Sequence, residues 1–420
     1  MKKSSENPMI FVSYFCGIKG MVMAEWADDK LRVLASLERK VYVITSLYSV
    51  SNVQGDITYF RVPSLSWSDF KREILEFKNR NNRLSFWHYM LLPYAYIFGK
   101  LYDLLTKKWI NDGNPARWSW ALTCLPIVIF IKFRYKCKKI FCTGGAAGAQ
   151  LLGVLVSKLC AIKLYLEFQD PIIGAEIHRS FENEVSIIRL ENYFINASSK
   201  TVYVTKEAAK SASKRHPELV NKIHGIYPGS WQFFLNQNEK NLNQLENFEF
   251  VHLGTLYGSR NLNNFFVALD QLVAEGFPNA ENVKVKNLGS ININPSSIYA
   301  NRKEFKSVEI LNRVDALSYC SRSDMLLLVQ HSDARSFETI PYKTYDYFNL
   351  NMPIFGIVNN PELEEILTSL NHYCANSTSV DSIKNQIAKI LTSKFGPAKI
   401  SSTFVSPYNI TEQFSQIIDE

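Results

Sequence analysis

Short apolar runs alternate with amphipathic stretches along most of the chain. In the first half, runs rich in β-branched and aromatic residues predict strands at residues 10–15, 40–45, 57–62, 139–143, 163–168 and 201–205. Stretches with helical spacing of apolar residues, such as 23–37 and 150–160, lie between these runs. This alternation predicts parallel β-sheets whose strands are joined by right-handed helical crossovers.

The second half repeats this alternation. Its apolar runs predict strands at residues 249–253, 283–288, 307–310, 325–329 and 354–357. Helical spacing recurs at residues 262–275 and 361–370, and the latter helix has Asn360 as its expected N-cap and Pro361 at its first position. The second half is therefore expected to form another parallel sheet flanked by helices.

A polar connection separates the two halves. A Pro-Gly turn within residues 224–231 precedes the run 236–247, which is rich in Asn, Gln, Glu and Lys. With 420 residues, the chain exceeds the usual size of one hydrophobic core. We therefore predict two α/β domains, at residues 1–228 and 229–405.

Composition indicates what kind of protein this is, but not which reaction it catalyses. Hydrophobic residues make up 46% of the chain and aromatic residues 13%, as in folded globular proteins. The seven cysteines are odd in number and form no Cys-x-x-Cys pair, which favours free thiols in a reducing, cytoplasmic compartment. The seven histidines are scattered without metal-binding spacing, so we expect no metal site.

Positive charge is concentrated in the first half. Residues 1–225 contain 32 Lys and Arg against 19 Asp and Glu, whereas residues 226–420 contain 15 against 20. The segment 86–139 combines many aromatic residues with clustered basic residues, which fits a helix lying on an anionic membrane. Its apolar run 118–131 is interrupted by Pro126 and is too short to span a bilayer. The alternative is a buried crossover helix with a basic exposed end.

Two carboxylates stand eight positions apart shortly after the strand predicted at 325–329. Glu338 and Asp346 flank Pro341, which suits a helix start, and a rise of 1.5 Å per residue separates the acids by at most about 12 Å. Carboxylates accept hydrogen bonds from hydroxyl groups, and free N–H groups at a helix start bind phosphate. The segment predicts a site for a phosphorylated, polyhydroxylated ligand, or else a surface helix with ordinary exposed acids.

Glycine turns follow predicted strands in both halves. Gly254 and Thr255 end the first strand of the second half, and Arg260 precedes a predicted helix, a layout that suits phosphate. Gly17 and Gly20 form a Gly-x-x-Gly turn after the first strand of the chain. Neither turn matches the dinucleotide fingerprint Gly-x-Gly-x-x-Gly, and no P-loop sequence is present. The turn at Gly17 and Gly20 is at least as compatible with a tight connection from strand to helix, and the turn at Gly254 is a weak motif on its own.

These motifs, taken in order, resemble those of a known family. The chain is similar to GT-B glycosyltransferases, in particular the retaining family-4 enzymes of bacterial surface-polysaccharide biosynthesis. The similarity covers essentially the whole chain and rests on the segments 17–20, 164–171, 202–208, 226–229, 253–260, 316–324 and 338–346. It implies an α/β fold of two Rossmann-like domains, an active site in the cleft between them, and a C-terminal helix within 406–420 that packs back on the first domain.

The resemblance also implies roles for individual residues. Glu338 corresponds to the acid beside the transferred sugar, and Asp346 to the ribose-binding acid, which is a glutamate in the family. Arg260 and Lys343 would hold the diphosphate and stabilise charge on the leaving group. The alternative for Lys343 is a surface ion pair with Asp346. Arg313 lies where similar enzymes hold the nucleobase, or else is an exposed loop arginine. The other expected donor-binding residues are Gly254, Thr255, Thr339 and Tyr342.

The first domain is expected to bind the acceptor, with Gly17, Gly20 and Asp170 on its side of the cleft. A retaining enzyme needs no protein base, because the leaving phosphate takes the acceptor proton, whereas an inverting enzyme would use Asp170 as general base. The expected partners are a nucleotide sugar, a lipid-linked or membrane-associated glycan, and an anionic membrane surface through residues 86–139. We expect no cofactor and no nucleic acid, and a cytoplasmic protein bound peripherally to the inner face of the cytoplasmic membrane.

Two other functions are compatible with the same sequence. A sugar-nucleotide epimerase shares the two-domain architecture, and it would form its product without an acceptor. A non-catalytic protein would use the basic face to bind nucleic acid, but its aromatic residues should then alternate with Lys and Arg along a groove. Here the aromatic residues gather in one apolar stretch, which fits lipid or core better. The favoured interpretation, which the family resemblance implies, is a hexosyltransferase that uses a nucleotide sugar.

Overall fold

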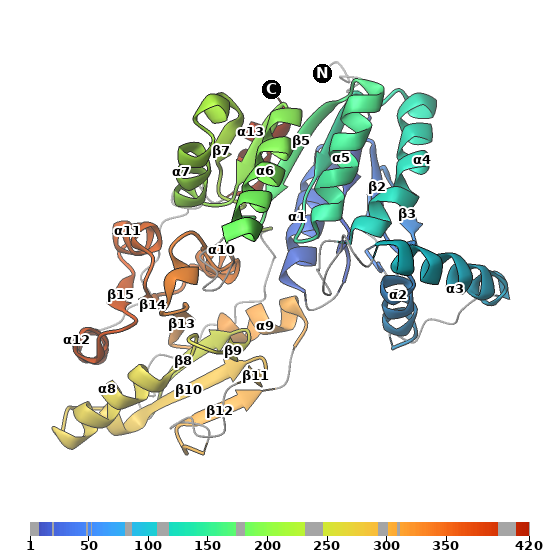
Figure 1. The fold of residues 1–420 in the computed structure, drawn as a ribbon. Coiled ribbons are helices and arrows are strands. Elements are labelled where there is room, and N and C mark those ends of the chain that lie inside the picture. The colour runs from blue at the N-terminus through green and yellow to red at the C-terminus, as the bar shows by residue number, and fades with distance from the viewer. Residues whose placement is uncertain are drawn as a thin grey trace.

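The computed structural model consists of two α/β units, each built around a parallel sheet (Figure 1). The residues that the structure describes are 8–18, 21–47, 49–51, 53–79, 86–106, 117–173, 181–231, 247–292, 301–308, 311–393 and 409–419. The seven cysteines are free thiols and six of them are buried, as expected for small core residues.

In the described part of the chain, the sheet of the first unit has the strand order β3-β2-β1-β4-β5-β6-β7. Its strands are β1 Met9–Val12, β2 Val41–Ser46, β3 Ile57–Val62, β4 Lys139–Cys142, β5 Lys163–Phe168, β6 Lys200–Tyr203 and β7 Ile223–Gly225. Strands β1 and β2 are buried throughout, which explains why they read as continuous apolar runs in the sequence. The short edge strand β7 has no such run, and the sequence pattern does not predict it.

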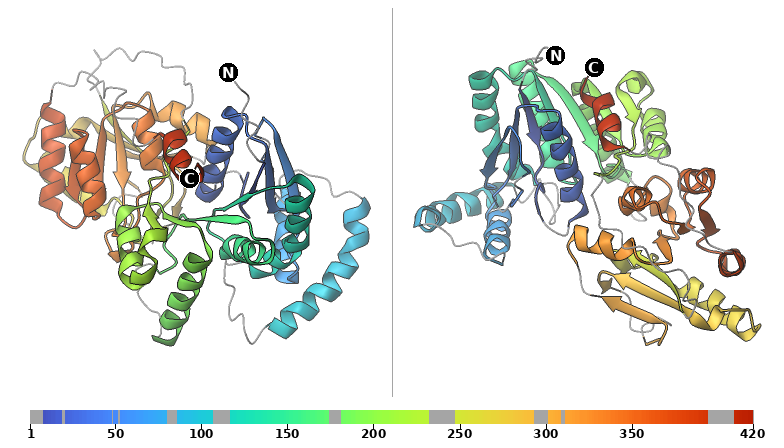
Figure 2. Two further views of the ribbon diagram at one scale, coloured as in Figure 1. Left: turned by 90° about the horizontal axis from the view of Figure 1, so that it is seen from above. Right: turned by 180° about the vertical axis from the view of Figure 1, so that it is seen from behind.

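Helices cover both faces of the first sheet (Figure 2). The helical segments of this unit are α1 Val22–Ser36, α2 Trp67–Asn79, α3 Phe86–Thr106, α4 Trp118–Tyr135, α5 Ala147–Cys160, α6 Phe181–Ala197, α7 Lys206–Arg215, η1 Pro217–Lys222 and α13 Ile410–Ile418. Helices α1 and α13 pack together on one face, and α4, α5 and α6 cover the other. Two lysines bind carbonyl groups of α13: Lys139 Nζ lies 2.5 Å from Ile418 O, and Lys200 Nζ lies 2.8 Å from Gln416 O. The last described helix therefore belongs to the first unit.

The apolar segment 118–131 forms most of α4, which packs against α5. Trp120 is fully buried and its indole N–H donates to Val62 O at 3.0 Å, so one face of the helix is core. On other faces Phe130 and Phe133 are 60% and 61% exposed. The helix thus has the buried face of a crossover helix together with exposed aromatic residues. No helix among the described residues is long and apolar enough to cross a membrane.

The second unit has the sheet order β12-β10-β8-β13-β14-β15 within the described residues. Its strands are β8 Phe248–Leu253, β10 Val283–Leu288, β12 Phe305–Val308, β13 Met325–Val329, β14 Ile354–Val358 and β15 Tyr373–Asn376, beside the small pair β9 Leu256–Tyr257 and β11 Ile291–Asn292. Its helical segments are α8 Asn263–Ala274, η2 Ala280–Asn282, α9 Arg313–Cys320, η3 Ala334–Ser336, α10 Lys343–Asn349, α11 Pro361–Ser369 and α12 Val380–Thr392. As predicted, Asn360 caps α11, accepting hydrogen bonds from the N–H groups of Glu362 and Leu363.

Both sheets have a point where the order of their strands reverses. In the first sheet this point lies between β1 and β4, and in the second between β8 and β13. In open parallel sheets, ligands bind in the crevice beyond the carboxyl ends of the strands at such a point. The predicted α/β fold of two Rossmann-like halves is confirmed. Its topology predicts that the loops after β1, β8 and β13 bind a ligand.

Candidate active site between the two units

A cavity of about 1420 Å³ lies between the two units. The first unit contributes one face of α1 and the loops after β1, β2 and β5, and the second contributes the loops after β8, β10 and β13 and the start of α10. The sequence-predicted site residues that line it are Gly17, Asp170, Gly254, Thr255, Arg260, Arg313, Glu338, Thr339, Tyr342, Lys343 and Asp346. Gly20, the remaining predicted residue, lies outside the described residues.

Two glycine turns bring the backbone close to the cavity in the second unit. Gly254 follows β8 with φ of 116°, a conformation that strongly favours glycine, and its N–H donates to Leu288 O at 2.9 Å. A Cβ atom at Gly289 would lie 2.6 Å from Gly254 O, so the two loops pack too closely for a larger residue. Thr255 continues this contact, since its Oγ1 lies 3.0 Å from Ser290 Oγ. These turns hold the cavity wall from which Arg260 extends.

Arg260 and Lys343 supply positive charge to this wall, and neither forms an ion pair with a carboxylate of the described residues. Burial lowers the pKa of the Arg260 guanidinium. Burial, together with the nearby Arg260 charge, lowers the pKa of the Lys343 ammonium well below its usual value. Two cations held close together without an acidic partner form a site for an anion.

His252 is fully buried, does not line the cavity, and contacts Lys343. Its Nε2 lies 2.5 Å from Lys343 Nζ, and its Nδ1 lies 2.6 Å from Asn287 Oδ1. Burial and the Lys343 charge lower the pKa of His252 well below its usual value, so the ring is neutral. A neutral ring with its proton on Nδ1 satisfies both contacts, donating to Asn287 and accepting from Lys343.

Acidic groups line the same cavity from both units. The Oε2 atom of Glu338 is buried and has no hydrogen-bond partner among the described residues. The loop that carries Glu338 is tied to the first unit, because Thr205 Oγ1 donates to Glu338 O at 2.8 Å. Across the cavity, enclosure by the protein raises the pKa of the Asp170 carboxyl, and the positive charge of Arg260 partly opposes this effect. Arg260 and Asp170 therefore interact electrostatically across the two units.

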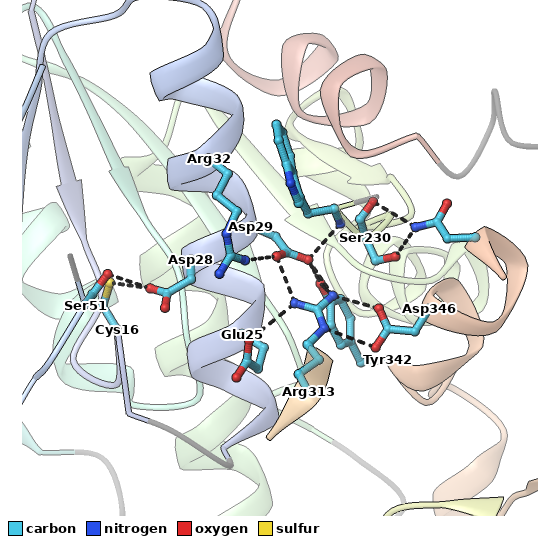
Figure 3. A network of polar contacts seen from close by, with 12 residues as sticks. Cys16, Glu25, Asp28, Asp29, Arg32, Ser51, Ser230, Arg313, Tyr342 and Asp346 are labelled. Atoms are coloured by element: carbon cyan, nitrogen blue, oxygen red, sulfur yellow. Dashed lines mark hydrogen bonds and ion pairs between the residues drawn. The ribbon is translucent and has the colours of Figure 1, made fainter. Parts of the chain in front are cut away.

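Arg313 lies at the edge of the cavity. It begins α9 and is only 9% exposed, so the interpretation as an exposed loop arginine is wrong. Its guanidinium binds Asp29 of α1 through two contacts of 2.8 and 2.7 Å, and it binds Asp346 at 2.7 Å (Figure 3). Tyr342 completes the group by donating to Asp29. Arg313 thus bridges the two units at the edge of the cavity.

Asp346 and Lys343 are neighbours on α10 but point to different partners. Both oxygens of Asp346 contact Arg313, whereas Lys343 contacts His252. The alternative of a surface ion pair between Lys343 and Asp346 is therefore wrong. Burial raises the pKa of Asp346, and the Arg313 charge opposes this shift. Asp346 is therefore a buried carboxylate at the cavity wall that is hydrogen-bonded to Arg313, and not an exposed surface acid.

Sequence reasoning missed Asp29, Glu25 and His252. Asp29 is fully buried, and Glu25 contacts Arg313 at 3.3 Å. The signal that was available is the pair of adjacent acids, Asp28 and Asp29, inside an otherwise amphipathic helix. No group of three or more His, Cys, Asp and Glu side chains in the described ranges is arranged to hold a metal ion.

Comparison with known proteins identifies the fold. No protein-family model and no curated protein sequence matches the chain. A sucrose-phosphate synthase from Thermosynechococcus elongatus superposes with a TM-score of 0.65 at 9% identity over 98% of both chains. HepE from Anabaena, in complex with UDP-glucose, superposes with a TM-score of 0.60 at 10% identity over 98% of both chains. The fold is GT-B.

Another similar structure has been assigned a different activity. A protein from Listeria monocytogenes assigned as a UDP-N-acetylglucosamine 2-epimerase superposes with a TM-score of 0.55 at 10% identity, over 98% of this chain and 94% of that one. Glycosyltransferases and this epimerase thus share the GT-B architecture. The fold alone therefore does not assign either reaction to this chain.

Proposed function

We propose that the protein is a glycosyltransferase that transfers a hexose from a nucleotide sugar to a glycan acceptor. The observation that carries the proposal is the pair of cations, Arg260 and Lys343, that form no ion pair with a carboxylate of the described residues. They line the same cavity as Glu338, whose Oε2 atom has no hydrogen-bond partner among those residues. Burying such groups without partners is unfavourable, so this wall suits a ligand that brings both an anion and hydroxyl groups. A nucleotide sugar provides a diphosphate for the cations and a sugar for the carboxylate.

In the proposed reaction, an acceptor hydroxyl attacks the anomeric carbon while the bond from that carbon to the diphosphate breaks. Arg260 and Lys343 stabilise the negative charge that develops on the departing diphosphate, and Glu338 orients the sugar. These side chains supply the positive charge, so the proposal requires no metal. Retention, which the family resemblance implies, needs no protein base, because the departing phosphate takes the proton of the acceptor hydroxyl. If the reaction inverts, Asp170 is the candidate base that takes this proton.

The proposed acceptor is a lipid-linked or membrane-associated glycan, with the protein bound peripherally to the cytoplasmic face of the membrane. Support comes from α3, which extends away from the body of the first unit (Figure 1). Its outer face carries large apolar side chains that are 49% to 71% exposed, namely Ile97, Phe98, Leu101, Leu104 and Leu105. Exposed apolar side chains on a unit rich in Lys and Arg suit an anionic lipid surface.

An epimerase is the second candidate, because the Listeria structure has the same architecture. The two functions differ in what they need. A transferase releases the nucleoside diphosphate mainly when an acceptor is present, whereas an epimerase converts the nucleotide sugar without one. Incubation of the protein with each nucleotide sugar, with and without bacterial glycolipid, followed by chromatography of the nucleotides, separates these outcomes.

Ligand binding tests the proposed donor site directly. Nucleotides and nucleotide sugars are screened by thermal shift, since a ligand at 100 times its Kd stabilises the folded state by about 2.7 kcal/mol. We expect Arg260→Ala and Lys343→Ala to lose the stabilisation seen with the wild-type protein. Glu338→Gln should retain nucleotide binding but lose about 100-fold in turnover. Lys306→Ala, on β12 outside the cavity, is the control. Turnover that survives both Arg260→Ala and Glu338→Gln would refute the proposed site.

A further inference from the structure

A buried cluster of charged groups lies where the chain passes between the two units. We call Glu25, Asp29, Arg313, Tyr342 and Asp346 the hinge cluster (Figure 3). The connecting segment touches this cluster, because the N–H of Trp231 donates to Asp29 Oδ2 at 2.8 Å. Glu25 and Asp29 belong to α1 of the first unit, and the other members belong to the second.

The Arg313 guanidinium holds one carboxylate from each unit. Its Nη1 and Nη2 atoms contact the two oxygens of Asp29 at 2.8 and 2.7 Å. Its Nη2 and Nε atoms contact the two oxygens of Asp346 at 2.7 and 3.3 Å. Because the guanidinium is planar and rigid, fixing one edge on Asp29 fixes the orientation of the other edge, and with it the Asp346 carboxylate.

Asp29 has no remaining capacity for a ligand. Besides Arg313, it accepts from Arg32 at 2.5 Å, from the Trp231 N–H and from Tyr342, which uses the lone pairs of a carboxylate fully. It is also fully buried and does not line the cavity. Asp346 differs, because it lines the cavity and accepts from fewer donors. A lone pair of Asp346 is therefore available to a ligand hydroxyl.

We propose that Asp29 is a positioning residue for the donor site, and that it acts through Arg313 to orient Asp346 toward the ribose of the nucleotide. This inference rests on the proposed function, since it assumes a nucleoside diphosphate in the cavity. It assigns the ribose and the diphosphate to separate groups: the hinge cluster serves the ribose, and the Arg260–Lys343 pair serves the phosphates. Because Asp29 lies on α1, donor binding is also linked to the relative placement of the two units.

The test compares two ligands that differ in whether they contain ribose. Calorimetry measures binding of inorganic pyrophosphate and of whichever of UDP, ADP and GDP binds the wild type best. Asp29→Asn should weaken nucleoside diphosphate binding about tenfold, equal to about 1.4 kcal/mol, and change pyrophosphate binding less than twofold. In an Arg313→Gln background, Asp29→Asn should have no further effect on the nucleotide. Asp69→Asn, which breaks a partly buried ion pair with Arg117 outside the cavity, is the matched control.

Two results would overturn the inference. Equal weakening of nucleotide and pyrophosphate would mean that Asp29 only maintains the fold. An undiminished effect of Asp29→Asn in the Arg313→Gln background would mean that it does not act through Arg313. Arg313→Lys keeps the charge but cannot hold two carboxylates at once, so it should show the same selective loss and replaces Asp29→Asn if that variant does not fold. Either of these results, obtained with a wild-type protein that binds a nucleoside diphosphate, contradicts this inference alone, whereas a wild-type protein that binds no nucleoside diphosphate contradicts the proposed function as well.

Discussion

Arg260 and Arg313 line the same cavity but have opposite surroundings. Arg313 contacts three carboxylates, from Asp29, Asp346 and Glu25, and these charges hold its pKa well above its usual value even though it is buried. Arg260 has no ion-pair partner among the described residues, and burial lowers its pKa. One arginine therefore has its charge balanced by the protein, and the other does not.

This difference indicates that Arg313 has a structural role and that Arg260 is available to bind a ligand. A charge that the protein itself balances stabilises the arrangement of the two units, and it offers little to a ligand. A charge left unbalanced in a cavity destabilises the empty protein and is balanced when an anion binds. The cavity is thus divided, with a satisfied acidic side at the hinge cluster and an unsatisfied basic side at Arg260 and Lys343.

The largest expected effect is on stability without ligand. Arg313→Ala leaves Asp346 buried without its cation and Asp29 with Arg32 alone, so it should lower the free energy of unfolding by about 3–5 kcal/mol. Arg260→Ala removes a cation that has no partner, so it should be neutral or slightly stabilising. Urea denaturation of both variants at one pH measures the contrast. Arg302→Ala, which breaks an exposed pair with Asp270, is the control and should cost less than about 1 kcal/mol.

Equal losses for Arg313→Ala and Arg260→Ala would show that Arg260 has a partner that balances its charge in the empty protein. That outcome would remove the distinction between the two sides of the cavity. A destabilised Arg313→Ala that regains stability with Asp346→Asn would sharpen the distinction, because it would trace the loss to the unpaired carboxylate.

A carboxylate without a cation extends the comparison beyond the cavity. Asp29 is buried beside Arg313 and Arg32, and its pKa is lowered. Glu73 of α2 is equally buried, but its hydrogen-bond donors are the neutral groups of Tyr14 and Ser64. Burial raises the pKa of Glu73 to about 7, and these hydrogen bonds only partly oppose the shift.

The raised pKa predicts how stability depends on pH. Between about pH 4.5 and pH 7 the folded state binds a proton at Glu73 that the unfolded state has lost, so this residue lowers stability as pH rises. Glu73→Gln cannot ionise. Relative to the wild type it should gain about 3 kcal/mol on going from pH 4.5 to pH 8. Denaturation at both pH values measures this gain, and a difference that does not change with pH would contradict it.

The sequence predicts much of this fold because buried strands have continuous apolar runs. Strands such as β2 and β13 have every residue buried, and both are found where the pattern places them. The edge strand β15 has one buried residue among its four, and its sequence carries no apolar run. Edge strands are held by the ladder of their neighbour more than by their own side chains, so their pattern is weak.

The sequence predicts which loops form the candidate site, but not which of its charged residues form ion pairs with one another. Glycines and charged residues at the ends of strands indicate which loops face the cavity, and those of Arg260 and Glu338 do so. The partner of Arg313 depends on how α1 docks against α9, between residues 284 positions apart in the chain. The spacing of residues within a short stretch of sequence gives no indication of such a contact. Asp29 could have been suspected only as an acid inside a buried helix face.

The cations exposed to water are a third class, and the smallest effects are expected there. Arg134, Lys136 and Lys138 are exposed near the end of α4, so neutralising them should change stability little. If this surface meets anionic lipid, each change of Lys or Arg to Gln should weaken binding to phosphatidylserine vesicles by about 1 kcal/mol, or about fivefold. Sedimentation with vesicles of graded charge measures the loss, and Lys306→Gln on the second unit is the control. Binding that falls equally with the control would assign the attraction to net charge, and binding that survives all three changes would assign it to the apolar face of α3. A wild-type protein that binds no vesicles would exclude the membrane as a partner.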